Sequence, residues 1–226
     1  LWDMIEVPVI AIDGDASSGK TSISKMLSKE LGFYFLDSGI LYRTMGYIKV
    51  NENVKFDSPH DINDILSKIK LIPDKEKYFR VNFNNIDITN KLYTEDIGQQ
   101  ASIVSQYSLV REALLMLQHS CVSKPGLIAN GRDMGTKVFP GAKLKIFMTA
   151  SIEVRAERRY RELIASGLEV KLTDIQNKIA ERDDSDKNRD ISPLKLASDA
   201  HIIDSTNLNL ETILDKILEL YNIWIA

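Results

Sequence analysis

The chain has few of the features that mark secreted, metal-binding or membrane proteins. Its single cysteine, Cys121, cannot form an intrachain disulfide, and no cysteine–histidine spacing typical of a zinc site occurs. No apolar run approaches membrane-spanning length, and the acidic start LWDMIEVPVIAID lacks the basic segment of a signal peptide. A formal net charge of -3 argues against a general polyanion binder. We therefore expect a cytoplasmic protein that binds neither membrane nor nucleic acid, with Cys121 as a small buried side chain.

The most informative stretch runs from Val9 to Thr21, VIAIDGDASSGKT. An apolar run ends in Asp13-Gly14, the spacing G-x-x-x-x-G-K-[ST] follows, and an amphipathic run continues to Leu31. This order of strand, loop and helix favours a phosphate-binding P-loop over an ordinary glycine turn. Backbone N–H groups and the helix N-terminus would both face a phosphate. The predicted nucleoside triphosphate site comprises Gly14, Asp15, Ala16, Ser17, Ser18, Gly19, Lys20, Thr21 and Ser22.

Two side chains of this loop predict catalytic chemistry. Lys20 is placed to bridge the β- and γ-phosphates, and the Thr21 hydroxyl to bind Mg²⁺. A GTPase-type switch would need an NKxD loop, but Asn90-Lys91 is followed by Leu92-Tyr93, and no strand delivers a DxxG element. A small kinase needs a second anion site and a closing lid, which Arg43, Arg132 and the arginines of 155–189 can supply. The kinase interpretation is favoured over the switch, and over a nucleic-acid motor.

Alternation of short apolar runs with helical patterns predicts a doubly wound α/β core with ligands at the strand C-termini. The expected strands cover residues 9–12, 33–36, 127–129, 144–148 and 201–204. The expected helices cover 22–31, 40–52, 95–105, 109–121, 151–165 and 172–182, with a closing helix after 207. The charged segment 181–190 is expected after the end of its helix, as part of a mobile lid.

Residues 53–96 have a different character. A helix capped at Ser58-Pro59 is predicted to extend through Ile69, followed by a β-hairpin that turns at Asn84-Asn85. This segment is expected to be an inserted subdomain.

Five segments, taken in order, resemble bacterial cytidylate (CMP/dCMP) kinases, which are P-loop nucleoside monophosphate kinases. They are IAIDG…GK, LDSGILYR, ASIVSQYSLVREALL, GRDMGTKVFP and ERDDSDKNR. The resemblance implies ATP-dependent phosphorylation of CMP or dCMP in pyrimidine metabolism, on a P-loop core with a parallel five-stranded sheet flanked by helices. It further implies one kinase domain over 1–226. Within it lie a core of 1–52 and 97–226, a helical lid at about 151–190, and a small α+β NMP-binding insert at 53–96.

The resemblance also assigns roles to side chains. The base-reading groups fall on Ser102, Arg111 and Asp133. A carboxylate can accept from the cytosine N4 amino group while a guanidinium donates to N3 or O2, and uracil reverses that edge. The remaining substrate contacts and catalytic charges are Ser38, Arg43, Arg132 and Arg189 for the acceptor and its phosphate, Arg182 and Asp186 for the sugar, and Arg158 for the ATP phosphates.

One departure from the family pattern concerns Asn130, where relatives often carry an acid able to hold a Mg²⁺-bound water. Asparagine brings no charge, so Asn130 is left out of the metal site. Asp37 is either structural or water-positioning. Adenylate-kinase-like and shikimate-kinase-like enzymes are the nearest alternatives, because each uses the same loop with another acceptor pocket. Without a heptad seam, a monomer is expected.

Overall fold

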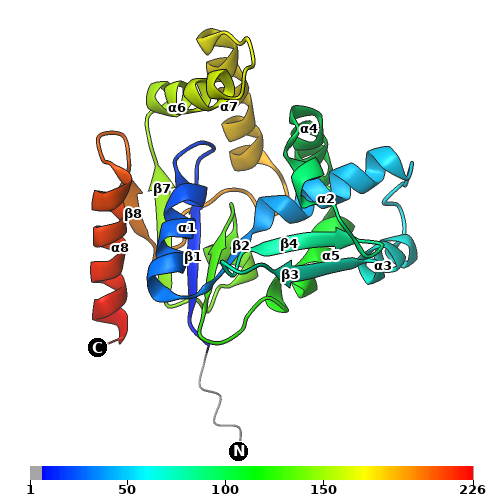
Figure 1. Ribbon diagram of the computed structural model, residues 1–226, viewed down its shortest axis with the longest axis horizontal. Coiled ribbons are helices and arrows are strands. Elements are labelled where there is room, and N and C mark those ends of the chain that lie inside the picture. Colours follow the sequence, from blue (N-terminus) through cyan, green and yellow to red (C-terminus); the bar gives the residue numbers. More distant parts are fainter. Residues whose placement is uncertain (1–6, 226) are drawn as a thin grey trace, which may run out of the picture. The chain divides into compact units, whose positions relative to one another are not determined.

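The computed structural model describes residues 7–225 (Figure 1), and the described part forms two compact units. Unit 1 takes its described residues from Leu1–Val9 and Ser28–Asn130, and unit 2 from Ile10–Leu27 and Gly131–Ala226. Residues 1–6 lie outside the described residues. The expectation that the acidic start of the chain is not a signal peptide therefore stays a prediction.

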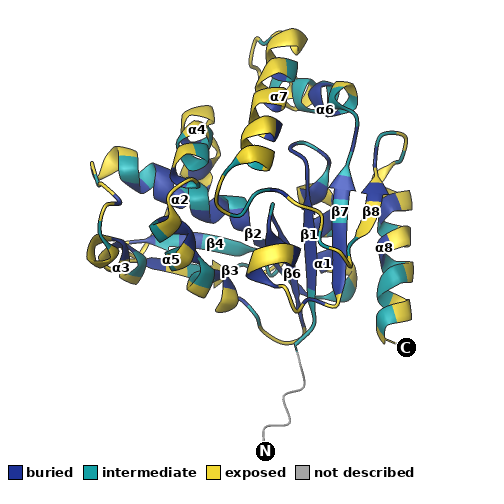
Figure 2. Cartoon of the chain, turned by 180° about the vertical axis from the view of Figure 1, so that it is seen from behind, coloured by how far each residue is buried: buried dark blue, intermediate teal, exposed yellow. Residues whose placement is uncertain are grey.

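Five short strands form the main sheet, in the order β2-β6-β1-β7-β8. They are β1 (Val9–Gly14), β2 (Tyr34–Asp37), β6 (Leu127–Asn130), β7 (Leu144–Thr149) and β8 (His201–Asp204). In unit 1 β2 pairs with β6 in parallel, and in unit 2 β7 pairs in parallel with both β1 and β8. Figure 2 colours β1 and β7 mostly as buried, as expected for continuous apolar runs in a parallel sheet. The predicted α/β fold with a parallel five-stranded sheet is confirmed.

The helices begin largely where the sequence predicts them. They are α1 (Lys20–Leu31), α2 (Ser38–Asn51), α4 (Glu95–Val104), α5 (Ser108–His119), α6 (Ile152–Ala165), α7 (Leu172–Asn188) and α8 (Leu210–Ile225). Side-chain caps fix several starts, since Asp37, Thr94 and Ser151 each accept a hydrogen bond from a backbone N–H of the first turn. Gly32, with φ of 64°, ends α1 in the left-handed conformation that glycine tolerates.

The predicted end of the helix at residue 182 is wrong, because α7 continues to Asn188. Its last turns are stabilised by contacts that a run of charges does not reveal. Asp183 is buried in an ion pair with Arg155, and the Asn188 amide donates to Asp184 at 2.7 Å. The charged segment is therefore helical over most of its length.

The insert contains a small antiparallel sheet. Its elements are α3 (Pro59–Ser67), β3 (Ile69–Pro73), β4 (Phe79–Phe83), β5 (Ile86–Asp87) and a 3₁₀ turn η1 (Thr89–Tyr93). The hairpin turn at Asn84 and Asn85 is confirmed, with φ of 51° and 61°. Placing Ile69 on the helix is wrong, because it opens β3 opposite Phe83. A lone apolar residue at that spacing fits a helix face and a strand equally well.

In unit 1 the insert is attached to β2 through backbone and side-chain contacts. The Phe35 N–H donates to the Lys77 carbonyl at 3.0 Å, and the Lys77 ammonium donates to the Gly32 carbonyl at 2.6 Å. The rings of Phe35 and Tyr78 meet edge to face at 5.6 Å.

The prediction for Cys121 is confirmed. Its side chain is 2% exposed, and burial raises the pKa of the thiol to about 12. In residues 7–225, no helix has both the length and the apolar character needed to span a membrane.

Candidate active site

The predicted P-loop has the backbone that its glycines allow. Gly14 has φ of 140°, and a Cβ there would collide with the backbone of Met148, whose carbonyl accepts from the Asp15 N–H at 3.1 Å. Gly19 has φ of 94° and Ser17 φ of 57°, both in the region that favours glycine. This conformation wraps the loop between β1 and the first turn of α1, where helix N–H groups are available to an anion.

Lys20 opens α1 and is 6% exposed. Its ammonium donates to the Asp15 carbonyl and, at 3.3 Å, to the Ser18 hydroxyl. Burial lowers the pKa of Lys20 well below its usual value, and the nearby Arg132 and Arg182 guanidiniums lower it further. Three cationic side chains thus lie near one another, and a bound phosphate chain would offset their mutual repulsion.

The remaining loop residues differ in exposure. Asp15, Ala16 and Ser18 are buried, Ser17 is half-buried, and Thr21 and Ser22 are exposed on the first turn of α1. The partners of Asp15 and Ser18 lie far away in the chain and carry no local sequence signal. Thr149 donates to Asp15 at 2.7 Å, and the Ser205 hydroxyl donates to the Ser18 carbonyl at 3.0 Å.

Arg158, predicted to face ATP phosphates, is anchored beside this loop. It donates to the hydroxyl of Ser205 at 3.0 Å and to its carbonyl at 2.7 Å. Burial lowers its pKa. Its role toward ATP stays a prediction.

Arg155 is the arginine most enclosed in α6, at 5% exposure. It donates to the carbonyls of Ala150 at 2.9 Å and Ala16 at 3.1 Å, and to the Asp183 carboxylate at 2.6 Å. These bonds join α6, α7 and the P-loop within unit 2. Nothing in the local sequence distinguishes Arg155 from its neighbours, because its partner is 28 residues away.

The segment GRDMG, residues 131–135, follows β6 and contains Arg132 and Asp133. It belongs to unit 2. The Arg132 guanidinium donates to Asp186 at 2.7 Å, and Arg189 lies 3.5 Å from the same carboxylate. Burial alone would raise the pKa of Asp186, but Arg132, Arg182 and Arg189 together hold it below its usual value. The structure therefore gathers three predicted substrate residues, Arg132, Arg182 and Arg189, around the carboxylate of a fourth, Asp186.

In unit 1, Ser38 is the first residue of α2 and is buried. Asp37 caps this helix by accepting from the Gly39 N–H at 3.1 Å, which supports its structural interpretation. Arg43 projects from the next turn and donates to the carbonyls of Leu92 at 2.9 Å and Thr94 at 3.1 Å.

Two predicted base readers in unit 1 are linked through Ser105. Arg111 is 7% exposed, lies 5.2 Å from the centre of the Tyr42 ring, and donates to the Ser105 carbonyl at 3.2 Å. The Ser105 hydroxyl in turn donates to the Ser102 carbonyl at 2.8 Å. Asp133, the third base reader, belongs to unit 2 and is 3% exposed. That these three side chains read one base stays a prediction.

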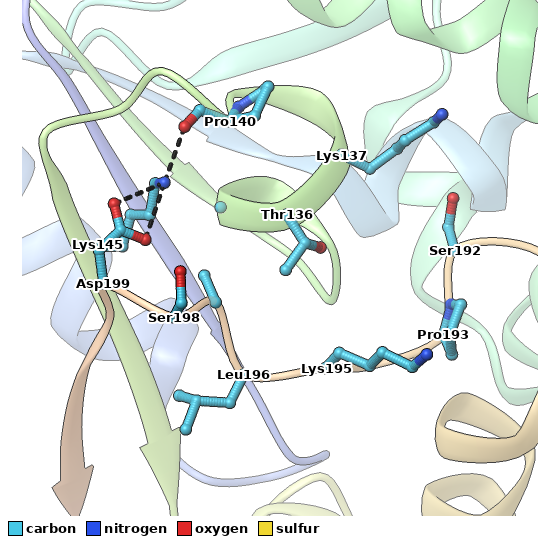
Figure 3. A pocket seen from close by; sticks show the side chains of 12 residues that line it. Thr136, Lys137, Pro140, Lys145, Ser192, Pro193, Lys195, Leu196, Ser198 and Asp199 are labelled. Atoms are coloured by element: carbon cyan, nitrogen blue, oxygen red, sulfur yellow. Dashed lines mark hydrogen bonds and ion pairs between the residues drawn. The ribbon is translucent and has the colours of Figure 1, made fainter.

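A pocket of about 450 Å³ in unit 2 contains none of the predicted site residues. Figure 3 shows it between the turn at Thr136-Lys137 and the segment 192–199. Its buried cation, Lys145, is already bonded to Asp199 at 2.8 Å and to the Pro140 carbonyl at 2.7 Å. Among the described residues, no group of three or more His, Cys, Asp or Glu side chains could hold a metal ion.

The cytidylate kinase family model matches residues 10–223 of this chain. The chain belongs to the cytidylate kinase family. The cytidylate kinase of Ralstonia nicotianae is 37% identical over 214 residues, which cover 95% of this chain and 92% of that relative. The cytidylate kinase of Caldicellulosiruptor saccharolyticus is 41% identical over 216 residues, 94% of each chain. The resemblance inferred from the sequence is confirmed.

A solved shikimate kinase from Bacteroides thetaiotaomicron is 11% identical, with a TM-score of 0.45 and coverage of 95% of this chain and 98% of that one. A likeness of that degree supports no statement about the activity of this cytidylate kinase family member.

Proposed function

We propose that this protein transfers the γ-phosphoryl group of ATP to CMP or dCMP, giving CDP or dCDP and ADP. The observation that carries the proposal is the clustering of Lys20, Arg132 and Arg182 beside a P-loop in a member of the cytidylate kinase family. Lys20 faces the nucleotide loop, Arg132 follows a sheet strand, and Arg182 comes from α7. Cations from three elements suit a reaction in which charge spreads over a transferring phosphoryl group.

The acceptor oxygen belongs to a phosphate that is already ionised, so transfer needs no general base. The protein's part is to hold donor and acceptor in line and to neutralise charge. Lys20 and Arg158 act on the ATP phosphates, and Arg43, Arg132 and Arg189 bind the acceptor phosphate. Guanidinium groups suit that task because each offers two parallel donors to phosphate oxygens.

Base selection rests on Ser102, Arg111 and Asp133. In this assignment the Asp133 carboxylate accepts from the cytosine N4 amino group, while Arg111 donates to N3 or O2. Uracil would place an oxygen against the carboxylate and an N–H against the guanidinium. Buried polar groups without a hydrogen-bond partner are costly, so the site should bind uracil much more weakly than cytosine.

Magnesium fits this site through the hydroxyl of Thr21, an exposed residue on the first turn of α1. Mg²⁺ commonly retains waters and binds through substrate phosphates with few protein ligands, so one hydroxyl is a sufficient protein contribution. When bound, the ion would neutralise charge on the phosphate oxygens. Asn130 supplies no charge and is left outside the metal site.

The domain assignment forms part of the proposal. Residues 1–52 and 97–226 make the kinase core, 53–96 the NMP-binding insert, and about 151–190 the lid, whose described helices are α6 and α7. The protein acts as a cytoplasmic monomer on ATP and CMP or dCMP.

The proposal is tested by measuring ADP release from Mg-ATP with CMP, dCMP, UMP, AMP or shikimate as the acceptor. Turnover with CMP and dCMP is expected to be far above that with UMP and AMP. Turnover with AMP or shikimate alone would retain the P-loop assignment and refute the acceptor. Hydrolysis of ATP or GTP without any acceptor preference would instead favour the switch class.

Asp133→Ala provides the first residue test of this proposal. Losing a charge-assisted hydrogen bond should lower the ratio of kcat/KM for CMP over UMP by at least about tenfold. The affinity for an ATP analogue should change by less than about twofold, because the base-reading carboxylate does not contact ATP. Equal losses for both nucleotides would contradict the role of Asp133 in reading cytosine.

A further inference from the structure

We propose that Asp13 is a positioning residue for the acceptor nucleotide. Its buried carboxylate fixes the loop 131–135 and thereby sets the orientation of Arg132 and Asp133. The meaning of that orientation rests on the proposed function, whereas the attachment of the loop to Asp13 does not.

The loop is attached to the end of β1 at three points. The Gly131 N–H donates to the Ile12 carbonyl at 3.0 Å. The Met134 N–H donates to Asp13 Oδ1 at 2.8 Å, and the Gly135 N–H donates to Asp13 Oδ2 at 2.8 Å. Arg132 and Asp133 are the two residues between these attachments, so their backbone is held on both sides.

The residues after the loop constrain Asp133 from the other direction. Met134–Val138 form a π-helical turn, η2, in which the Asp133 carbonyl accepts from the Lys137 N–H at 2.8 Å and the Val138 N–H at 3.0 Å. Asp133 itself has φ of -141° and ψ of 22°. With its carbonyl bound by η2 and the next two N–H groups bound by Asp13, the backbone of Asp133 is fixed, which sets the direction in which its side chain leaves the chain.

The attachment requires a carboxylate. The two consecutive N–H donors bind one carboxylate oxygen each, and Asp13 is only 4% exposed, so water is a poor alternative partner for them. An asparagine would satisfy one donor and set its own NH₂ group against the other. A charged acceptor also makes each of the two bonds stronger than a neutral one.

Close packing limits the alternative positions of the loop. A Cβ added at Gly135 would lie 3.1 Å from Lys145 Cδ and 3.4 Å from Asp13 Oδ2. Gly135 is therefore confined between the carboxylate and the Lys145 side chain, which is itself held by Asp199. We therefore infer that the loop keeps a single conformation only when the Asp13 carboxylate binds its N–H groups.

Asp13→Asn is the first test, with amide hydrogen exchange as a readout that needs no activity. We expect exchange to speed up about tenfold at Met134 and Gly135, while the P-loop amides change little. Asp199→Asn is the matched control. It removes a carboxylate from Lys145, on the other side of Gly135, but no bond to the loop N–H groups. Unchanged exchange at Met134 and Gly135 in Asp13→Asn would overturn the proposal.

The functional consequence is tested by selectivity. Asp13→Asn should lower the ratio of kcat/KM for CMP over UMP about tenfold, with less than about twofold change in ATP-analogue affinity. Combined with Asp133→Ala, it should add little further loss, because one change acts through the other. Fully additive losses, or equal losses of ATP and CMP binding, would refute the positioning role.

Gly135→Ala is a second variant that retains the Asp13 charge. Its methyl group should displace the loop by a few tenths of an ångström and reduce CMP selectivity in the same direction. An unchanged selectivity in both variants would overturn the inference. Should the natural protein fail to phosphorylate CMP, the proposed function is refuted, and exchange at Met134 and Gly135 still decides whether Asp13 holds the loop.

Discussion

The Arg155–Asp183 ion pair is almost fully enclosed, its two side chains being 6% and 10% exposed. Removing charges from water is costly, and only close contact with further hydrogen bonds offsets that cost. Arg155 meets this condition through the carbonyls of Ala150 and Ala16. The pair thus links helix α7 to the nucleotide loop at the cost of making either partner hard to replace.

Asp183→Ala should lower the free energy of unfolding by about 3 kcal/mol, because the Arg155 guanidinium stays buried without its carboxylate. Urea denaturation measures this directly. Glu157→Ala is the matched control, since it removes the exposed partner of Arg161 and should cost less than about 0.5 kcal/mol. Equal losses in the two variants would show that the buried pair does not form in solution.

Asp13 predicts a distinct pH dependence. Burial raises its pKa to about 6 from 3.8, with Asp133 adding to the rise, while the two N–H bonds and Lys20 oppose it. The folded protein holds this proton more tightly than the unfolded chain does. The contribution of Asp13 to stability therefore falls as pH rises from about 4 through about 6 and is constant above about pH 7.

This dependence is measured by comparing natural protein with Asp13→Asn, which has no titrating group at that position. Relative to the variant, the natural protein should lose about 2 kcal/mol of unfolding free energy between pH 4 and pH 7. Asp186, whose pKa is lowered, contributes in the opposite sense in both proteins and cancels. A difference that does not change with pH would contradict the raised pKa.

At the scale of elements, α6 and α7 form a helical hairpin with a small core of its own (Figure 1). Its buried members are Ala156, Ile175 and Ile179, supported by partly buried Ile152, Tyr160, Leu163 and Val170. A core of this size stabilises the hairpin only weakly apart from the bonds of Arg155. Such an element is suited to open and close without disturbing the sheet.

We therefore expect hydrogen exchange in residues 167–190 to slow when a non-hydrolysable ATP analogue and CMP are added together. Ile175→Ala removes a central part of the hairpin core and should speed exchange in both helices, at a local cost of about 2 kcal/mol or more. The same variant should also have a lower kcat, because a less stable lid closes less often. Identical exchange with and without the two nucleotides would count against a closing lid.

Elements with local signals could be predicted from the sequence, and those that depend on distant partners could not. The P-loop, the caps at Ser58 and Ser151, and the Asn84-Asn85 turn are each encoded within a few residues. The last turns of α7 depend on Asp183, which is 28 residues from its partner. Strand β3 was missed because Ile69 fits helical spacing as well as strand pairing.

The candidate site divides in the same way. Residues of the nucleotide loop follow from spacing alone, whereas the Arg132–Asp186 pair joins residues 54 positions apart. The bonds of Asp13 span 121 and 122 positions and hold a π-helical turn that has no recognised sequence pattern. Only the fold brings such groups together, so their roles could not be read from local sequence.

At the scale of the whole molecule, the formal net charge is -3, yet Lys20, Arg132 and Arg182 make one site locally cationic. An acceptor that neutralises these cations should stabilise the folded state in proportion to its affinity. CMP at about 100 times its dissociation constant should add about 2.7 kcal/mol, or roughly 5–10 °C in Tm for a chain of this length.

Calorimetry with CMP, UMP and cytidine at equal concentrations separates the contributions to this stabilisation. UMP should raise Tm less than CMP because its base edge is reversed, and cytidine should raise it less because it lacks the phosphate. Equal shifts from CMP and UMP would contradict base reading by Arg111 and Asp133.

The buried thiol of Cys121 has a practical consequence for spectroscopy. With a pKa of about 12 and 2% exposure, it presents almost no thiolate to a maleimide dye at neutral pH. Because it is the only cysteine, the natural chain already serves as an unlabelled background. A variant such as Lys178→Cys, at an exposed position on α7, would carry a single fluorophore or spin label on that helix without any prior removal of cysteine.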